Sequence, residues 1–547
     1  MEIIIIGSGL AGLSAAIRCA ENSIKSVIVS VQPSHCAQSV LAAGGINAVL
    51  KDNTENDSIM QHAEDTWNAG CRLADREAVT RLTENAPGII DFLQRSGVIF
   101  SQDAKGHVAQ RYFGGQKQKR TCYSHAGIGK QMMNGLEQKV RCYCDQGLIR
   151  IMDHHRFLSP VIHAGRIQGA VLADAYTGEL SYLEGPVIAA SGGMNQVMGN
   201  TTGSVHSDGS VTASLYTAGV KMANLEMIQY HPTTVRTAAK NMLISEAARG
   251  EGGRLFTYRN GQKWYFCEDW YGEKGNLMPR DVISRAIDRV LREKLSDDTE
   301  YVWLDMTHLG ERLINERLAE VRTLCIDYLK LDPVRESIPV VPGVHYFMGG
   351  IWTDCNHRTS MPGLYAAGEC CAQYHGANRL GGNSTLGAIY GGQCAADSVC
   401  SDLSGHEMET DTSFAEEVLK EQQRQLRAFE LLTDDSVSKR LEVQYMMQDC
   451  MGITRDEKSL QTGAEKLADW LQRNAPKEVT ADQTAAGTNL TAIYQYQTYL
   501  LAELGSGMVQ SALSRKESRG AHYRTDYPEL NPEYEKPTMI QFSPRES

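Results

Sequence analysis

The sequence predicts an α/β protein built on a Rossmann-like dinucleotide-binding domain, with a helical domain toward the C-terminus. Residues 2–21, "EIIIIGSGLAGLSAAIRCAE", have the pattern of a buried strand, a glycine turn and a helix. Two later stretches, "GPVIAASGG" at 185–193 and "MPGLYAAGECC" at 361–371, are apolar strands that run into glycines. From about 413 to 505 the chain is charged, poor in glycine and has Leu at helical spacing, which indicates a packed helical bundle.

The first turn contains the G-x-G-x-x-G pattern at Gly7, Gly9 and Gly12. Gly7 permits the turn, Gly9 lets the backbone approach a pyrophosphate, and Gly12 lets the helix pack on the strand. The pyrophosphate then meets the positive end of the helix. We expect a dinucleotide here, beside Ser8 and Ala11. The alternative is a tight strand-to-helix turn without a ligand.

The second strand, "SVIVSV" at 26–31, ends at Ser30 and Val31. Nicotinamide-binding domains have an acid at this point to hold a ribose hydroxyl, so the departure disfavours a nicotinamide cofactor. Strands from distant parts of the chain that join one nucleotide-binding domain fit FAD, because FAD is long enough to contact the ends of several strands. Glu369, after the third strand, is a candidate ribose or flavin ligand, or else a first-turn acid that stabilises a helix.

Composition excludes several function classes. The chain has 547 residues, enough for three or four units, and its 42% hydrophobic and 22% charged residues are ordinary for a globular protein. A formal net charge of -12 without a Lys/Arg block argues against a nucleic-acid partner. The first apolar run is too short for a signal peptide or a membrane span. We therefore expect a cytoplasmic protein that meets a membrane, at its inner face, only through partners.

The 14 cysteines are scattered and lack the short repeated spacings of zinc and iron–sulfur sites. We expect reduced thiols and no metal site in this chain. If the chain exchanges electrons, another subunit must hold the clusters.

Six motifs follow one another: "QYHPTT", "SEAARGEGGR", "GNLMPRDVISRAI", "VHYFMGG", "HGANRLGGNS" and "RKESRGAHY". In this order and spacing, residues from about 2 to about 530 resemble the flavoprotein subunits of succinate dehydrogenase and fumarate reductase, a family of FAD-dependent oxidoreductases that includes L-aspartate oxidase. The resemblance implies an FAD-binding domain at 1–224 and 346–404, an inserted α+β capping domain at 225–345, a helical domain at 405–515 and a tail at 516–547. The polar stretch 401–411 is the predicted linker.

The resemblance also implies an enzyme that moves a hydride between FAD and a C4 dicarboxylate, fumarate or succinate. Clamps for two carboxylates are then needed, and Arg379 suits one because a guanidinium binds a carboxylate with two parallel hydrogen bonds. By resemblance the substrate ligands are His231, Ser245, His345, Arg379 and Phe113. Structural histidines are the alternative for His231 and His345.

The resemblance implies that Arg280 is the general acid that protonates the substrate, and that Glu246 and Arg249 resupply it with protons. Arginine is an unusual acid because its pKa lies above about 12, but it can release a proton as carbanion charge builds on the substrate. The alternative is a surface ion pair of Arg280 with Asp281 and a solvated helix face.

FAD contacts are expected at many points of the chain. Besides the first turn and Glu369, the expected residues are Ser30, Ser39, Gly44, Gly45, Ser191, Gly192, Asp208, Asn383, Ser384 and Leu386. Many respiratory relatives bond FAD covalently to a His that lies six residues before the first glycine of the pair corresponding to Gly44 and Gly45. Here that position is Gln38, whereas His35 lies nine residues before Gly44. We predict non-covalent FAD, unless a three-residue longer loop brings His35 to the flavin.

Phe113 distinguishes the members of the family. In "QRYFGGQKQKR", Phe113 precedes the glycine pair at 114–115. L-Aspartate oxidases place a Glu immediately before this pair, where it can hold the substrate ammonium group, and a buried ammonium without a carboxylate partner is costly. Phe113 therefore favours fumarate or succinate, with electrons exchanged with an iron–sulfur subunit. The alternatives are an L-aspartate oxidase, which oxidises aspartate to iminoaspartate in NAD synthesis, a non-catalytic flavin-binding subunit of a larger complex, and reductases of related 2-enoic acids.

Overall fold

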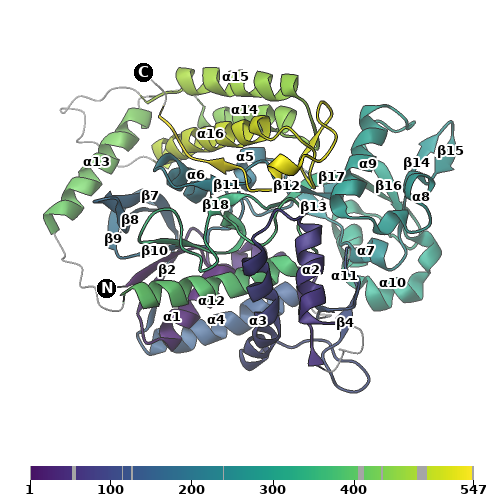
Figure 1. The fold of residues 1–547 in the computed structure, drawn as a ribbon, viewed down its shortest axis with the longest axis horizontal. Helices are drawn as coiled ribbons and strands as arrows, with labels where there is room; N and C mark the ends of the chain where they lie inside the picture. The colour runs from purple at the N-terminus through teal and green to yellow at the C-terminus, as the bar shows by residue number, and fades with distance from the viewer. Residues whose placement is uncertain are drawn as a thin grey trace.

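The computed structural model describes residues 2–51, 57–113, 115–124, 127–237, 240–403, 412–430, 432, 435–476 and 490–544. Its N-terminal part is organised around a parallel sheet with the strand order β19-β10-β1-β2-β6 (Figure 1). The strands are β1 (Ile3–Ile6), β2 (Ser26–Ser30), β6 (Ile149–Asp153), β10 (Val187–Ala189) and β19 (Leu364–Ala366). Since β19 lies far along the chain, the sheet joins the first segment to a return segment.

Different layers cover the two faces of this sheet. One face, with Ile3 and Ile5, packs on helices; the other, with Ile4 and Ile6, packs on a second sheet. Because successive side chains of a strand point to opposite faces, the four isoleucines of β1 serve both cores. The helices are α1 (Leu10–Glu21), α3 (Arg76–Arg95), α4 (Ile128–Asp145) and α12 (Asn383–Leu403), and the second sheet is β7 (His155–His163), β8 (Arg166–Asp174) and β9 (Leu180–Glu184).

The capping region is an antiparallel sheet with the order β13-β12-β17-β16-β14-β15, on the right of Figure 1. Its helices pack around a separate apolar core that contains Leu255, Phe266 and Ile287. The strands are β12 (Ile228–Arg236), β13 (Asn241–Leu243), β14 (Arg254–Arg259), β15 (Gln262–Trp264), β16 (Val302–Asp305) and β17 (Ile338–Phe347). The helices are α7 (Ala247–Gly250), α8 (Phe266–Tyr271), α9 (Arg280–Arg292), α10 (Glu311–Arg317) and α11 (Ala319–Leu324).

The C-terminal helices lie above the parallel sheet in Figure 1. They share an apolar core with it and with two short helices. These helices are α13 (Thr412–Glu430), α14 (Ser436–Cys450), α15 (Glu457–Arg473) and α16 (Leu490–Ser514), and the short ones are α5 (Asn195–Met198) and α6 (Ser210–Thr217). The remaining elements are α2 (Ile59–Ala69), β3 (Ile46–Asn47), β4 (Gln110–Arg111), β5 (Thr121–Cys122), β11 (Met222–Ala223), β18 (Gly350–Trp352), β20 (Cys371–Ala372), β21 (Thr454–Arg455), β22 (Tyr523–Arg524) and β23 (Met539–Ile540).

After α16 the chain returns to the centre of the molecule. The tail loop, residues 519–522, packs behind the segment that holds Arg379, where Ala521 N donates to Ala377 O at 2.9 Å. Arg285 of α9 donates from Nη1 to Gly520 O at 2.7 Å. The tail loop therefore contacts both the return segment and the capping region.

The predicted fold class is confirmed: a Rossmann-like domain, an inserted α+β region and a C-terminal helical region. The domain boundaries stay predictions, and β17 crosses the one placed after residue 345. The boundary after 404 and most of the predicted linker at 401–411 lie outside the described residues. Within the described residues, no helix is both long and apolar enough to span a membrane.

Candidate active site

One cleft connects the first glycine turn with the capping region. Most of the predicted cofactor residues line it: Gly7, Ser8, Gly9, Ala11, Ser30, Ser39, Gly44, Gly45, Ser191, Gly192, Asp208, Glu369 and Ser384. The predicted substrate residues Phe113, His231, Ser245, His345 and Arg379 also line it, together with Arg280 and Glu246. Arg249 lies behind Glu246. The two predicted sets of residues therefore lie along one continuous cleft.

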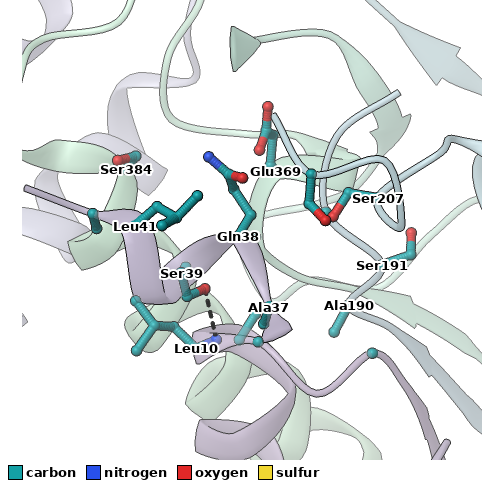
Figure 2. A pocket seen from close by; sticks show the side chains of 18 of the residues that line it. Leu10, Ala37, Gln38, Ser39, Leu41, Ala190, Ser191, Ser207, Glu369 and Ser384 are labelled. Atoms are coloured by element: carbon teal, nitrogen blue, oxygen red, sulfur yellow. Dashed lines mark hydrogen bonds between the residues drawn. The ribbon is translucent and has the colours of Figure 1, made fainter. Parts of the chain in front are cut away.

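The glycine turn leaves room for a phosphate at the start of α1. Gly7 has a φ of +120°, and a Cβ at Gly12 would lie 1.8 Å from Gly7 O, so both positions require glycine. Gly9 is open by contrast, because a Cβ there would have only Ser39 Oγ nearby, at 3.1 Å. The start of α1 has no side-chain cap from Gly9, and Leu10 N donates to Ser39 Oγ at 3.2 Å (Figure 2). This geometry fits a pyrophosphate.

Three predicted cofactor residues do not line the cleft. Gly12 packs against the Gly7 carbonyl, and Leu386 is buried in the core beneath α12. Asn383 accepts from Asn47 Nδ2 at 2.7 Å and donates to Thr66 Oγ1 at 2.9 Å. These residues support the walls of the cleft, and contacts of their own with the cofactor stay predictions.

Gln38 and His35 point to different surroundings. Gln38 lines the cleft, and its buried Oε1 has no hydrogen-bond partner among the described residues. Figure 2 shows its side chain projecting into the cleft on the side where Glu369 lies. His35 lies in the short 3-10 turn Ser34–Cys36, has no buried neighbours in that turn and does not line the cleft. An unpartnered buried amide oxygen fits a polar ligand in the cleft, as FAD would be.

Glu369 lies in the cleft, where its side chain is half-buried. One oxygen accepts from Phe347 N at 3.1 Å. Burial raises the pKa of this carboxyl group to about 7, against the smaller opposing effects of that hydrogen bond and of Arg379. Its ordinary pKa is near 4.5. A carboxyl group with this raised pKa takes up a proton near neutral pH and suits a hydrogen bond to a ligand hydroxyl.

At the substrate end, Arg280 is the first residue of α9, directly after Pro279. Its Nε and Nη2 donate to Glu246 Oε2 at 2.9 and 2.7 Å. Arg249 Nη2 lies 3.5 Å from Glu246 Oε1, and its Nη1 donates to Asn276 O at 2.7 Å. All three predicted proton-transfer residues are buried, which excludes the alternative of a solvated surface pair.

The charges of this cluster shift its pKa values. Burial alone would raise the pKa of Glu246, but the positive charges of Arg280 and Arg249 outweigh it and hold that pKa below its ordinary value. Burial, together with Arg280, lowers the pKa of Arg379 to about 10. The Arg379 Nε is buried and has no acceptor among the described residues. Three guanidinium groups therefore surround the Glu246 carboxylate, a surplus of two positive charges when Glu369, whose pKa is raised to about 7, is uncharged.

His231 and His345 lie with ring centroids 5.2 Å apart. Burial and the neighbouring Arg280 lower the pKa of both rings well below the ordinary value, so both are neutral. Thr202 Oγ1 is 2.8 Å from His345 Nδ1 and orients that ring. Ser245 also lines the cleft, and its Oγ accepts from Ala247 N at 3.3 Å.

Phe113 forms an apolar wall of the substrate end. It is buried, and a Cβ at Gly44 or Gly381 would meet its ring at 2.9 or 2.5 Å. Arg111 approaches the ring with its guanidinium carbon 5.6 Å from the centroid. The ring thus packs between the loop that holds Gly44 and the segment after Arg379.

Sequence reasoning missed Gln229, which links the two arginines of the cluster. Its Oε1 accepts from Arg280 Nη1 at 3.0 Å and from Arg379 Nη2 at 3.1 Å. It precedes His231 by two residues on β12, and residues two apart on a strand share a face. That spacing is the signal that could have identified it.

The fold and the cleft define an FAD-dependent oxidoreductase. Residues 2–385 match the family described as FAD binding domain, and residues 440–546 match the family described as fumarate reductase flavoprotein C-term. The chain is 35% identical to the succinate dehydrogenase flavoprotein subunit of Bacillus subtilis, over 99% of this chain and 94% of that one. It is 32% identical to L-aspartate oxidase 1 of Ralstonia nicotianae, over 99% of this chain and 98% of that one.

Among solved structures, a mutant E. coli quinol fumarate reductase superposes with a TM-score of 0.88 at 29% identity, covering 97% of this chain and 92% of that one. The chain belongs to the succinate dehydrogenase/fumarate reductase flavoprotein family, which also includes L-aspartate oxidase. It is an FAD-dependent oxidoreductase that acts on CH–CH groups, so the predicted family, enzyme class and cofactor are confirmed. Several relatives are named as subunits, that is, as parts of larger complexes.

Proposed function

We propose that this chain transfers a hydride between FAD and a C4 dicarboxylate, fumarate or succinate. The surplus of two positive charges at the substrate end is the observation on which this proposal rests, because a dicarboxylate brings two negative charges. Arg379, with its unpartnered Nε, is the clamp for one carboxylate. Neutral His231 and His345, with Ser245, supply the other hydrogen bonds.

Arg280 is the proton donor in this proposal. FAD, when bound, supplies or accepts the hydride. The positively charged guanidinium group of Arg280 binds the substrate. It releases an Nη proton to the substrate carbon as negative charge builds on that carbon. Glu246, 2.7 Å from Arg280 Nη2, returns the proton, and Arg249 lies behind Glu246 as the next donor. For succinate oxidation the same groups carry the proton in the opposite direction.

Phe113 favours a dicarboxylate over aspartate. By resemblance, the apolar ring takes the position of the Glu that can hold the substrate ammonium group in L-aspartate oxidases, and a buried ammonium beside a phenyl wall and three guanidinium groups is unfavourable. Aspartate oxidation is the second candidate, since L-aspartate oxidase 1 of Ralstonia nicotianae is among the relatives.

FAD is held without a covalent bond in this proposal. Gln38 faces the cleft and has no group that could bond to the flavin methyl carbon, whereas His35 lies outside the cleft. Denaturation in trichloroacetic acid tests this directly: the flavin should remain in the supernatant. Flavin fluorescence on the denatured polypeptide would show that His35, or another residue, forms a tether.

Electrons pass to or from an iron–sulfur subunit in this proposal, and any contact with the inner face of a membrane is made through partners. Support comes from the relatives named as flavoprotein subunits of succinate dehydrogenase and fumarate reductase. Affinity purification from the native host should recover an iron-containing protein in a fixed ratio to FAD. Recovery of the flavoprotein alone, fully active with a soluble donor from the host, would contradict the partner.

The substrate is tested with purified, FAD-loaded protein in two assays. Fumarate should oxidise reduced viologen, and aspartate with oxygen should give no hydrogen peroxide. Aspartate turnover without fumarate-dependent viologen oxidation would refute the dicarboxylate proposal. A chain that binds FAD but shows neither activity, nor succinate oxidation, would instead be a flavin-binding subunit without catalysis.

A further inference from the structure

The two arginines that the proposed reaction needs come from different parts of the chain. Arg280 begins α9 of the capping region, and Arg379 lies in the return segment before α12. A single side chain, Gln229 of β12, contacts both: its Oε1 accepts from Arg280 Nη1 at 3.0 Å and from Arg379 Nη2 at 3.1 Å. Gln229 is fully buried.

The amide of Gln229 has only one orientation that satisfies its neighbours. Its Nε2 donates to Asn378 Oδ1 at 2.8 Å and to the Arg379 carbonyl at 3.1 Å. A primary amide offers two acceptor positions and two donors, and all four are used here. In the flipped orientation the NH2 group would meet two guanidinium groups and the oxygen would meet two oxygens. The surroundings therefore fix the oxygen toward the arginines.

Contacts with the capping region also fix the orientation of Asn378, the hydrogen-bond partner of Gln229. Asn378 Nδ2 donates to Asp281 Oδ1 at 3.0 Å, so Asn378 cannot turn its NH2 group toward Gln229 without bringing its own oxygen against a carboxylate. Arg285 Nη2 lies 2.9 Å from the other oxygen of Asp281 and holds it. An uninterrupted series of hydrogen bonds thus runs from α9 through Asp281 and Asn378 to Gln229.

We propose that Gln229 is a positioning residue that sets the spacing between Arg280, the acid, and Arg379, the carboxylate clamp, so that both meet one dicarboxylate molecule. The inference rests on the proposed function and adds to it a residue outside the acid and clamp groups already assigned. A neutral amide can do this because it binds both cations through one oxygen without cancelling the positive charge that attracts the substrate. A carboxylate in its place would bind both arginines but remove one surplus charge.

Two variants separate spacing from charge. Gln229→Met keeps the size and the surplus charge but removes the shared acceptor. We expect the kcat for fumarate to fall about 100-fold, because a misplacement of about 1 Å costs that much, while the Kd for malonate rises less than about tenfold. Gln229→Glu keeps an acceptor for each arginine but lowers the net positive charge of the cluster. It also puts a carboxylate oxygen against Asn378 Oδ1, which accepts a hydrogen bond from Gln229 in the original chain. We expect its malonate Kd to rise more than about tenfold, because one of the two surplus charges is cancelled.

The measurements are steady-state fumarate reduction with reduced viologen and malonate titration followed by the absorbance of bound FAD. Gln444→Met is the matched control: Gln444 is also buried and donates to Gln196 O at 3.0 Å, but it lies in the helical region. We expect it to leave kcat, malonate Kd and FAD content unchanged.

The outcomes are distinct. A Gln229→Met protein with full FAD and a kcat close to that of the original chain would overturn the proposal. Loss of FAD and of thermal stability together in both variants would also overturn it, in favour of a purely structural role. If the unaltered chain binds malonate but does not reduce fumarate, the proposed function fails, whereas a malonate Kd that is raised by Gln229→Glu and not by Gln444→Met still places Gln229 beside the dicarboxylate site.

Discussion

Two buried clusters of guanidinium groups in this chain differ in their charge balance. In the cluster around the tail, Arg515 donates from Nε to Glu226 at 2.6 Å and from Nη1 to Glu517 at 2.7 Å. Arg519 Nε donates to the same oxygen of Glu517 at 2.7 Å. Two cations meet two carboxylates, and all four side chains are almost completely buried. These four side chains therefore balance one another's charge.

The cluster in the cleft has the same residue types but not the same balance. Arg249, Arg280 and Arg379 face Glu246, and the Arg379 Nε has no acceptor among the described residues. Burying an uncompensated charge is costly, so this arrangement favours the binding of an anion such as a dicarboxylate. In the proposed function, the balance of charges, rather than burial or residue type, distinguishes the cluster in the cleft from the four side chains near the tail.

The largest effect is expected from Arg280→Lys. A lysine ammonium cannot reproduce the three hydrogen bonds of the guanidinium to Glu246 and Gln229, and general acid catalysis contributes about 100-fold to 10,000-fold. We expect kcat for fumarate to fall about 1,000-fold with FAD content unchanged. Arg292→Lys, at the half-exposed end of the same helix, is the control and should keep full activity. Retained turnover in Arg280→Lys would remove it as the acid.

A change in the cluster around the tail should affect the stability of the folded protein rather than its activity. Glu517→Gln leaves Arg515 and Arg519 with one carboxylate fewer, and breaking a buried pair costs about 3 to 5 kcal/mol. We expect a large drop in the thermal unfolding midpoint, while the folded protein keeps its malonate Kd. Glu535→Gln, at an exposed position of the tail, serves as the control. A changed malonate Kd with unchanged stability would invert the assignment of the two clusters.

Glu369 is a third case, a half-buried carboxyl group whose charged form is disfavoured. Its pKa is raised from 4.5 to about 7 by burial. The folded FAD-free chain therefore binds this proton more tightly than the unfolded chain, and the resulting stability is lost as pH rises from about 4.5 through about 7. The loss is about 3 kcal/mol. Thermal midpoints of the FAD-free chain at pH 5 and 8 should differ less for Glu369→Gln, and equal differences would refute the shift.

Phe113→Glu should weaken the preference for a dianion. The new carboxylate cancels one surplus charge beside the substrate, and we expect the KM for fumarate to rise about 30-fold, or roughly 2 kcal/mol, with some gain in aspartate oxidation. Phe113→Leu keeps the apolar wall and should change the KM only slightly. A fumarate KM that rises equally in both variants would show that the shape of the ring, not the charge, matters.

The smallest effect concerns the neutral histidines. Thr202→Val removes the hydroxyl group that lies 2.8 Å from His345 Nδ1, and one such hydrogen bond contributes about 1 kcal/mol. We expect kcat/KM for fumarate to fall about fivefold. Thr217→Val, which removes a hydroxyl contact within α6, is the control. An unchanged kcat/KM would show that the ring is held by other contacts.

The parts of the fold that the sequence predicts are those imposed by backbone geometry. Gly7 and Gly12 could be identified because a side chain at either position meets the main chain at once. The count from Gly44 puts Gln38 at the position of the histidine that binds FAD in respiratory relatives, and in the structure Gln38 lines the cleft whereas His35 does not. Arg280, Glu246 and Arg379 were recognised as a set through their motifs.

What sequence reasoning missed depends on contacts between distant segments. Gln229 has no charge that marks it, and its partners Arg280 and Arg379 come from other elements. The tail cluster was likewise invisible, since Glu226 and Arg515 are 289 residues apart. The side chain of Leu386, a predicted cofactor residue, lies in the core, because a motif does not show which face of a helix a side chain occupies; its contact with the cofactor stays a prediction.

The contact between the tail loop and Ala377 has a consequence for cooperativity. Gly520 and Ala521 pack against the segment that holds Arg379, and Arg285 links the same loop to α9. Because one loop contacts both elements, a local opening of the tail loop would disturb Arg280 and Arg379 together.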